Sequence, residues 1–164
     1  MSGDDARGPT GAEPEADTPG TEPAGERLHL FEAFGVELEY MIVDAASLVA
    51  RPIADRLLID TDGEVRSEVE HGDISWSNGV VSHVIELQTT EPAPGLDGLD
   101  ERFATAVAEA NRRLAPLGAT LLGTGAHPFF DPHVETVVWP GEYTEVYRSY
   151  DRIFGVRGHG WSNL

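Results

Sequence analysis

Residues 34–43 constrain the fold of this chain more than any other stretch of its sequence. Glu37 and Glu39 are two residues apart in an otherwise apolar segment. Side chains two apart on a strand point to the same face, so we expect both carboxylates on one face, with Cα atoms about 6.6 to 7 Å apart. Two such acids are costly unless a cation lies between them, although the wet side of an antiparallel sheet would also accommodate them. The opposite face is apolar and comprises Val36, Leu38, Tyr40 and Ile42.

A second strand, predicted over residues 80–89, carries a carboxylate in the middle of an apolar run. Glu86 shares its face with Val84 and Gln88, and unpaired carboxylates are rarely buried in such surroundings. Oxygen-only ligands suit Mg²⁺ or Mn²⁺ better than zinc. The alternative is a partly wet sheet face with no metal. The candidate metal ligands are Glu37, Glu39 and Glu86.

The remaining patterns predict an α+β fold. Residues 98–115 carry apolar side chains at helical spacing, and with the strands before and after them they form a βαβ-type unit. Residues 59–73 are polar and turn-rich, so we predict no strand there. The predicted strands are 30–43, 74–77, 80–89 and 119–123, and the predicted helices are 53–58, 98–115 and 141–154.

The chain is strongly acidic. Its 164 residues include 29 acids and 11 bases, for a formal charge of −18. Such a surface repels nucleic acid and anionic membranes, so we expect neither as a partner. Residues 1–27 lack the large apolar side chains that would offset the entropy of ordering, which predicts a disordered acidic tail rather than a signal peptide. We expect residues 28–164 to form the folded part, in a cytoplasmic protein.

Three further residues are candidates for chemistry. His127 follows a predicted strand and could bind a phosphate or carboxylate, although packing on Phe129 or Phe130 explains it equally well. Arg157 could clamp a substrate carboxylate or a nucleotide phosphate, or form a surface ion pair. His159 lies between glycines and could reach a ligand, or end a strand. We therefore consider His127 and Arg157 as catalytic candidates and His159 as a cofactor-binding candidate.

Five motifs occur in an order that resembles a known family. Together they are similar to the bacterial type 2 glutamate–cysteine ligases and related carboxylate–amine ligases. Each motif alone is weak, and the five in sequence are specific. At Gly79, Ser82, Gly123 and Ala126 the chain has smaller residues than this resemblance leads us to expect. The motifs are residues 34–40 (FGVELEY), 76–78 (WSN), 83–89 (HVIELQT), 124–128 (TGAHP) and 150–164 (YDRIFGVRGHGWSNL).

The resemblance implies a fold, a metal site and a reaction. It implies a glutamine synthetase-like fold, in which a curved, mainly antiparallel sheet has helices on its outer face. Glu37 and Glu39 match the family's Gly-x-Glu-x-Glu pair, which holds Mg²⁺ (or Mn²⁺) on ATP, and Glu86 matches an acid on the following long strand. The implied reaction joins the γ-carboxylate of glutamate to the amine of cysteine with ATP as co-substrate, the first step of glutathione synthesis.

The same resemblance leaves alternatives open. A ligase of this fold could join another substrate pair, and a truncated domain could bind metal or a partner without chemistry. Family members continue beyond the motif that ends at Leu164, so we expect this chain to be an N-terminal portion that is inactive alone. We also expect an unpaired sheet edge to favour self-association.

Overall fold

The structure is a computed structural model that describes residues 28–156. The predicted tail, Arg157 and His159 lie outside the described residues. Short 3₁₀ helices cover Ala54–Arg56 and Ala115–Leu117. The strands are β1 (Glu37–Asp44), β2 (Glu68–His71), β3 (Ile74–Asn78), β4 (Val84–Thr89) and β5 (Ala119–Leu122), and the helices are α1 (Leu99–Leu114), α2 (Pro132–Glu135) and α3 (Thr144–Phe154).

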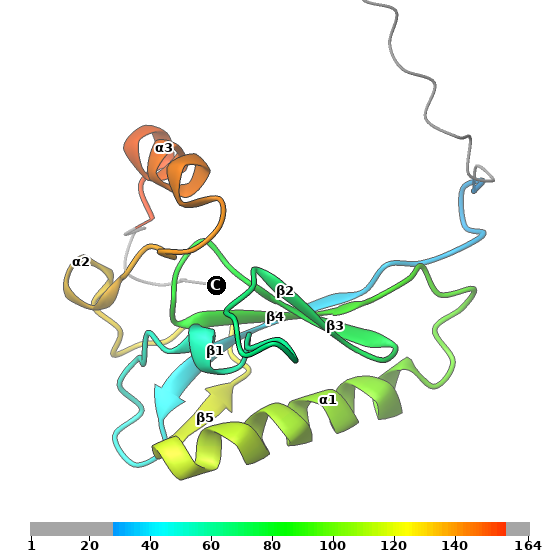
Figure 1. The fold of residues 1–164 in the computed structure, drawn as a ribbon, viewed down its shortest axis with the longest axis horizontal. Coiled ribbons are helices and arrows are strands. Elements are labelled where there is room, and N and C mark those ends of the chain that lie inside the picture. The colour runs from blue at the N-terminus through cyan, green and yellow to red at the C-terminus, as the bar shows by residue number, and fades with distance from the viewer. Residues whose placement is uncertain (1–27, 157–164) are drawn as a thin grey trace, which may run out of the picture.

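The strands form one five-stranded antiparallel sheet in the order β2-β3-β4-β1-β5 (Figure 1). β4 and β5 both run antiparallel to β1, so they are parallel to each other, and α1 connects them. This arrangement is the predicted βαβ-type unit with β1 inserted between its two strands. The α+β class predicted from the sequence is confirmed.

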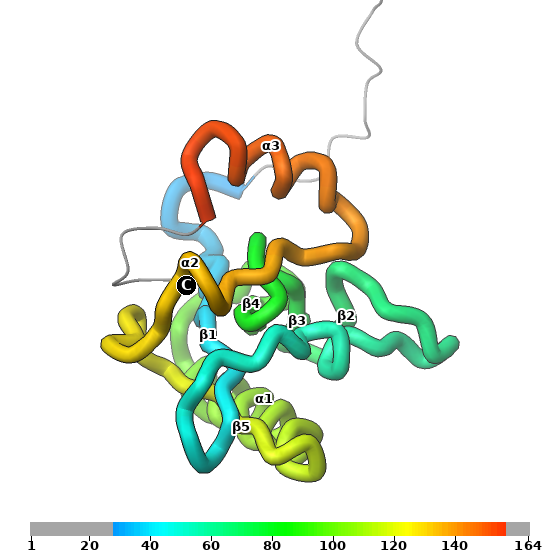
Figure 2. Tube along the Cα trace, turned by 90° about the vertical axis from the view of Figure 1, so that its left-hand side faces the viewer, coloured from blue at the N-terminus to red at the C-terminus, as the bar shows by residue number. Residues whose placement is uncertain are grey.

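Helix α1 covers one face of the sheet because its apolar stripe has the spacing of a helix face. Leu99, Phe103 and Ala110 pack into one core with strand residues that include Trp76 and Ile85. The apolar face of β1 points into this same core. Figures 1 and 2 place α1 on one side of the sheet and α3 on the other, so the expectation that helices lie only on the outer face is wrong for α3. Across the described part, we find no helix with both the length and the apolar character that crossing a membrane requires.

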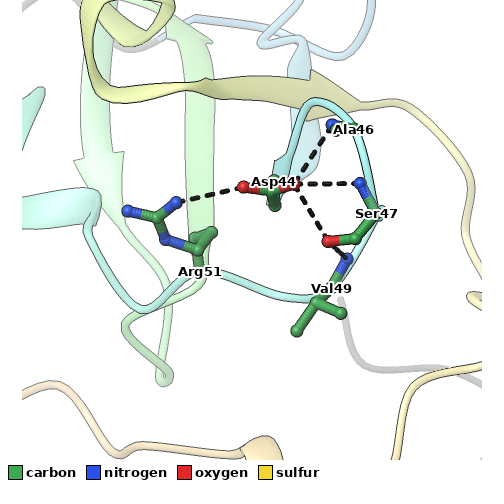
Figure 3. Close-up of polar contacts among 5 residues, drawn as sticks. All are labelled: Asp44, Ala46, Ser47, Val49 and Arg51. Carbon is green, nitrogen blue, oxygen red and sulfur yellow. Dashed lines mark hydrogen bonds and ion pairs between the residues drawn. The ribbon is translucent and has the colours of Figure 1, made fainter.

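The turn after β1 is built around Asp44 (Figure 3). Its Oδ1 accepts hydrogen bonds from the backbone N–H of Ala46 (3.1 Å) and from the N–H and hydroxyl of Ser47 (2.9 Å each). Its Oδ2 lies 3.4 Å from a guanidinium nitrogen of Arg51. The bond from the Ser47 backbone is the main cause that lowers the pKa of Asp44. The turn returns the chain alongside β1, where Ala50 forms an antiparallel bridge with Val43.

Four sequence predictions of secondary structure are wrong. Residues 30–36 were predicted as strand, but β1 begins only at Glu37. β2 lies within residues 59–73, where no strand was expected, and Val69 is its one buried residue. Residues 80–83 are a turn, so β4 begins only at Val84. Ser82 N–H bonds outside the sheet, to Val137 C=O at 2.8 Å, whereas His83 C=O accepts a 2.7 Å bond from Ile42 N–H of β1. Helix α2 was not expected either. Asp131 is its N-cap, and the Asp131 side chain accepts a hydrogen bond from His133 N–H.

Candidate functional site

Two rows of polar side chains cross four strands on the face opposite α1. Residues directly opposite each other on antiparallel strands share a face, with Cβ atoms about 4.5 to 5.5 Å apart. We call these eight residues the acidic face. The first row is Glu39, Glu86, Ser77 and Glu68, and the second row is Glu37, Gln88, Ser75 and Glu70.

The acidic face therefore brings the three predicted carboxylates together. Glu39 lies directly opposite Glu86, and Glu37 is one position along the same face of β1. The predicted common face is confirmed, and the role of these acids as metal ligands remains a prediction. Sequence reasoning missed Glu68 and Glu70, although Glu68-Val69-Glu70 repeats the acid–apolar–acid pattern of β1.

Glu86 is the least solvated of the three acids. It is half-buried, whereas Glu37 and Glu39 are exposed. Burial raises the pKa of Glu86 to about 7, and the negative charge of Glu37 is the second cause. The Ser77 hydroxyl donates a 3.1 Å hydrogen bond to Glu86 Oε2, which acts in the opposite direction. A carboxyl group in this position is stabilised either by a proton or by a cation.

The acidic face fits a hard divalent cation in its chemistry. Its donors are all oxygens, which Mg²⁺ and Mn²⁺ prefer, and the charge around Glu86 is uncompensated by any base on the face. Among residues 28–156, however, no three acidic or histidine side chains are already arranged to hold a metal ion. The residues that would hold it are Glu37, Glu39 and Glu86.

A pocket of about 400 Å³ adjoins Glu86 on the acidic face. Ser77, Glu86 and Gln88 line it from the sheet, and the start of α3 contributes Tyr143 and Tyr147. The sequence alone does not identify these tyrosines as site residues, because nothing local shows that α3 reaches the face opposite α1. Tyr147 is tied to the sheet by a 3.0 Å hydrogen bond that it accepts from Asn78 Nδ2.

His127 lies away from the acidic face. Its Nε2 is 2.7 Å from the carbonyl oxygen of Leu48, its Nδ1 accepts a hydrogen bond from Phe129 N–H (3.2 Å), and its ring approaches Phe130. Leu48 follows the far end of β1, and from Glu39 to that end is about 17 Å of strand. The structure therefore does not bring His127 to the acidic face, and both ring nitrogens are engaged with the backbone.

Two of the unexpectedly small residues are required by packing. A Cβ on Gly79 would lie 2.9 Å from Val84 Cγ1 and 3.3 Å from Glu86 Oε1. A Cβ on Gly123 would lie 2.9 Å from Tyr40 Cε1. These two departures from the family pattern fit the packing of this chain, because its neighbouring side chains already fill the space.

Comparison with known proteins identifies the family of this chain. The model of the family described as "Glutamate-cysteine ligase family 2(GCS2)" matches residues 33–161 of this chain. An uncharacterized protein of Archaeoglobus fulgidus is 31% identical over 130 residues, which are 79% of this chain and 34% of that protein. A protein of Saccharopolyspora erythraea named "Putative glutamate--cysteine ligase 2-1" is 30% identical over 125 residues, which are 76% of this chain and 30% of that protein.

The chain belongs to glutamate–cysteine ligase family 2. The matched part spans about a third of the length of these two relatives.

Proposed function

We propose that this chain forms the metal-binding part of the active site of an ATP-dependent ligase that joins the γ-carboxylate of glutamate to the amine of cysteine. The observation that carries the proposal is the direct pairing of Glu39 with a half-buried Glu86 on the acidic face. Family membership supports the ligase class. The residues that would hold Mg²⁺ or Mn²⁺ are Glu37, Glu39 and Glu86.

The proposed reaction has two steps. A γ-carboxylate oxygen of glutamate attacks the γ-phosphorus of ATP, and ADP leaves. The amine nitrogen of cysteine then attacks the acyl carbon of the resulting acyl phosphate, phosphate leaves, and the nitrogen loses a proton. The product is γ-glutamylcysteine, which makes this the first step of glutathione synthesis.

Positioning and neutralisation of charge account for most of the catalysis in phosphoryl transfer. A divalent cation held by Glu37, Glu39 and Glu86 would supply positive charge that offsets the negative charge developing during phosphoryl transfer. This chain needs such cations because its formal charge of −18 repels ATP. The chain's own residues would hold the cation and orient its ligands. Ser77, for example, fixes one oxygen of Glu86 through the 3.1 Å hydrogen bond.

The test of this chain is a metal titration. Mn²⁺ binding is followed by the loss of the free-ion spin-resonance signal, with Mg²⁺ as competitor. We expect Glu39→Gln and Glu86→Gln each to weaken binding about tenfold or more, because each removes a charged ligand. Glu101→Gln, on α1 and away from the acidic face, is the matched control. Equal Mn²⁺ affinity in all variants would contradict the metal site.

The substrate pair is tested by turnover. We expect none from this chain alone, because its matched part spans about a third of its relatives. ADP release that requires both glutamate and an amine is therefore measured on a protein that contains the whole family domain, with γ-glutamylcysteine identified by mass spectrometry. If other amines support ADP release and cysteine does not, the amine substrate is not cysteine.

A further inference from the structure

The pocket beside Glu86 is assembled from four separate parts of the chain. They are residues 66–68, 77–78, 86–88 and 142–147. Its volume of about 400 Å³ falls within the usual range for small-molecule sites, roughly 300 to 1,000 Å³. The hydrogen bond between Asn78 and Tyr147 holds the α3 side to the sheet, and Asn78 is only 5% exposed. The pocket is thus walled by elements that are fixed to one another.

The lining of the pocket is negatively charged. Glu68, Glu86 and Glu142 all line it, and Gln88 Nε2 holds Glu68 there through a 3.1 Å hydrogen bond. Arg66 is the one basic residue among the lining side chains.

The charge of Arg66 is already matched from outside the pocket. Its guanidinium pairs with the carboxylate of Asp62 and lies 3.6 Å from that of Asp60. It is therefore poorly placed to neutralise the three glutamates. A cationic ligand is favoured over an anionic one.

Aromatic rings complete the wall. Tyr143 and Tyr147 line the pocket with their rings edge to face, 6.5 Å apart. Ring faces attract organic ammonium groups, whereas a hydrated Mg²⁺ prefers oxygen ligands on every side. The combination of carboxylates, amide groups and tyrosine rings suits an alkylammonium group better than a metal ion.

We infer that this pocket binds the ammonium group of the amine substrate, an inference that rests on the proposed ligase function. Glu86 belongs both to the pocket and to the acidic face. An amine held in the pocket would therefore lie next to the carboxylates proposed to hold the metal. The two ligands would occupy neighbouring parts of one surface, with the metal toward β1 and the amine toward β2 and α3.

The test is an amide chemical-shift titration of the isotope-labelled chain with n-propylammonium chloride, with 1-propanol as the neutral analogue of the same size. We expect saturable shifts for the amides of Ser77, Asn78, Gln88 and Tyr143 with the ammonium compound and none with the alcohol. Glu142→Gln should weaken binding about two- to fivefold, as loss of one exposed charge partner does. Glu145→Gln is the matched control, since Glu145 pairs with Arg148 and does not line the pocket.

Shifts of equal size with the alcohol, or equal weakening in both variants, would overturn the inference. A parallel titration with Mg²⁺ separates it from the proposed function. Mg²⁺ shifts at Glu37 and Glu39 without ammonium binding at the pocket would refute the amine site alone. Ammonium binding without any Mg²⁺ shifts would refute the proposed metal site and leave the amine site standing.

Discussion

Glu86 differs from Glu37 and Glu39 because of where each residue lies in the sheet. β5 pairs with β1 only from Met41 onward, so Glu37 and Glu39 have a partner strand on one side only. Glu86 has β1 on one side and β3 on the other. The two flanking strands exclude water from Glu86. The two acids of β1 remain open to water on the side that lacks a partner strand. The short pairing of β5 with β1 therefore contributes to the difference in solvation among these three carboxylates.

Glu86→Gln should change the pH dependence of stability. The pKa of Glu86 is raised to about 7 in the folded protein, which therefore binds this proton more tightly than the unfolded chain. The free energy of unfolding should then fall as pH rises from about 4.5 to about 7. The glutamine variant lacks this fall and should be more stable at pH 7.5, by about 1 to 2 kcal/mol after allowance for solvent screening.

Urea unfolding at several values between pH 4.5 and 8 measures this effect. Comparison with the parent chain cancels the contribution of His71, whose pKa is lowered by burial and which acts in the opposite direction. Glu64→Gln, in an exposed loop, is the control. The same pH slope in the parent and in Glu86→Gln would show that Glu86 is already charged in the folded protein.

Gly79→Ala should destabilise the protein by about 1 to 3 kcal/mol, because the new methyl group meets the buried side chain of Val84 at 2.9 Å. The methyl group also approaches Glu86 Oε1, so the substitution should weaken metal binding as well as lower stability. Gly125→Ala is the matched control, since nothing lies within 4 Å of its added Cβ. Chemical unfolding of both variants measures the difference, and equal stabilities would contradict the tight packing at Gly79.

At the scale of elements, the sequence was informative where local pattern and burial agree. α1 has a continuous apolar stripe, and it was predicted to within one residue at each end. β2 was missed because an edge strand needs only one buried residue, Val69, and so carries no apolar run. The acids of β1 and β4 were predictable because they interrupt apolar runs. The pocket wall at α3 was not, because it depends on a contact between residues 78 and 147.

Tyr147→Phe should loosen α3. The substitution removes the hydroxyl that accepts the hydrogen bond from Asn78, which is worth about 1 kcal/mol. Hydrogen exchange of α3 amides should then be about fivefold faster, while exchange in α1 stays unchanged. Tyr150→Phe is the matched control, because Tyr150 lies on the same helix and is exposed. Equal exchange in the two variants would show that the bond does not hold α3 to the sheet.

At the scale of the whole molecule, two surface properties oppose each other. α3 is amphipathic and has no buried residue, and its apolar side chains stay open to solvent. Such a surface favours association. The formal charge of −18 favours separation of copies. We call the exposed side chains the α3 stripe, and they are Val146, Tyr150, Ile153 and Phe154.

Salt concentration should decide between these two effects. The Debye length falls from about 10 Å at 0.1 M to about 3 Å at 1 M ionic strength, so repulsion between copies is largely screened at the higher value. We expect sedimentation velocity to show a monomer at 0.1 M NaCl and reversible association at 1 M NaCl. Ile153→Glu should reduce that association, because it places a charge in the α3 stripe. Arg148→Gln changes the net charge equally but lies outside the stripe, so it should associate at 1 M NaCl as the parent chain does. If Ile153→Glu also associates as the parent does, the contact is not the α3 stripe, and the open edge of β2 becomes the surface to test.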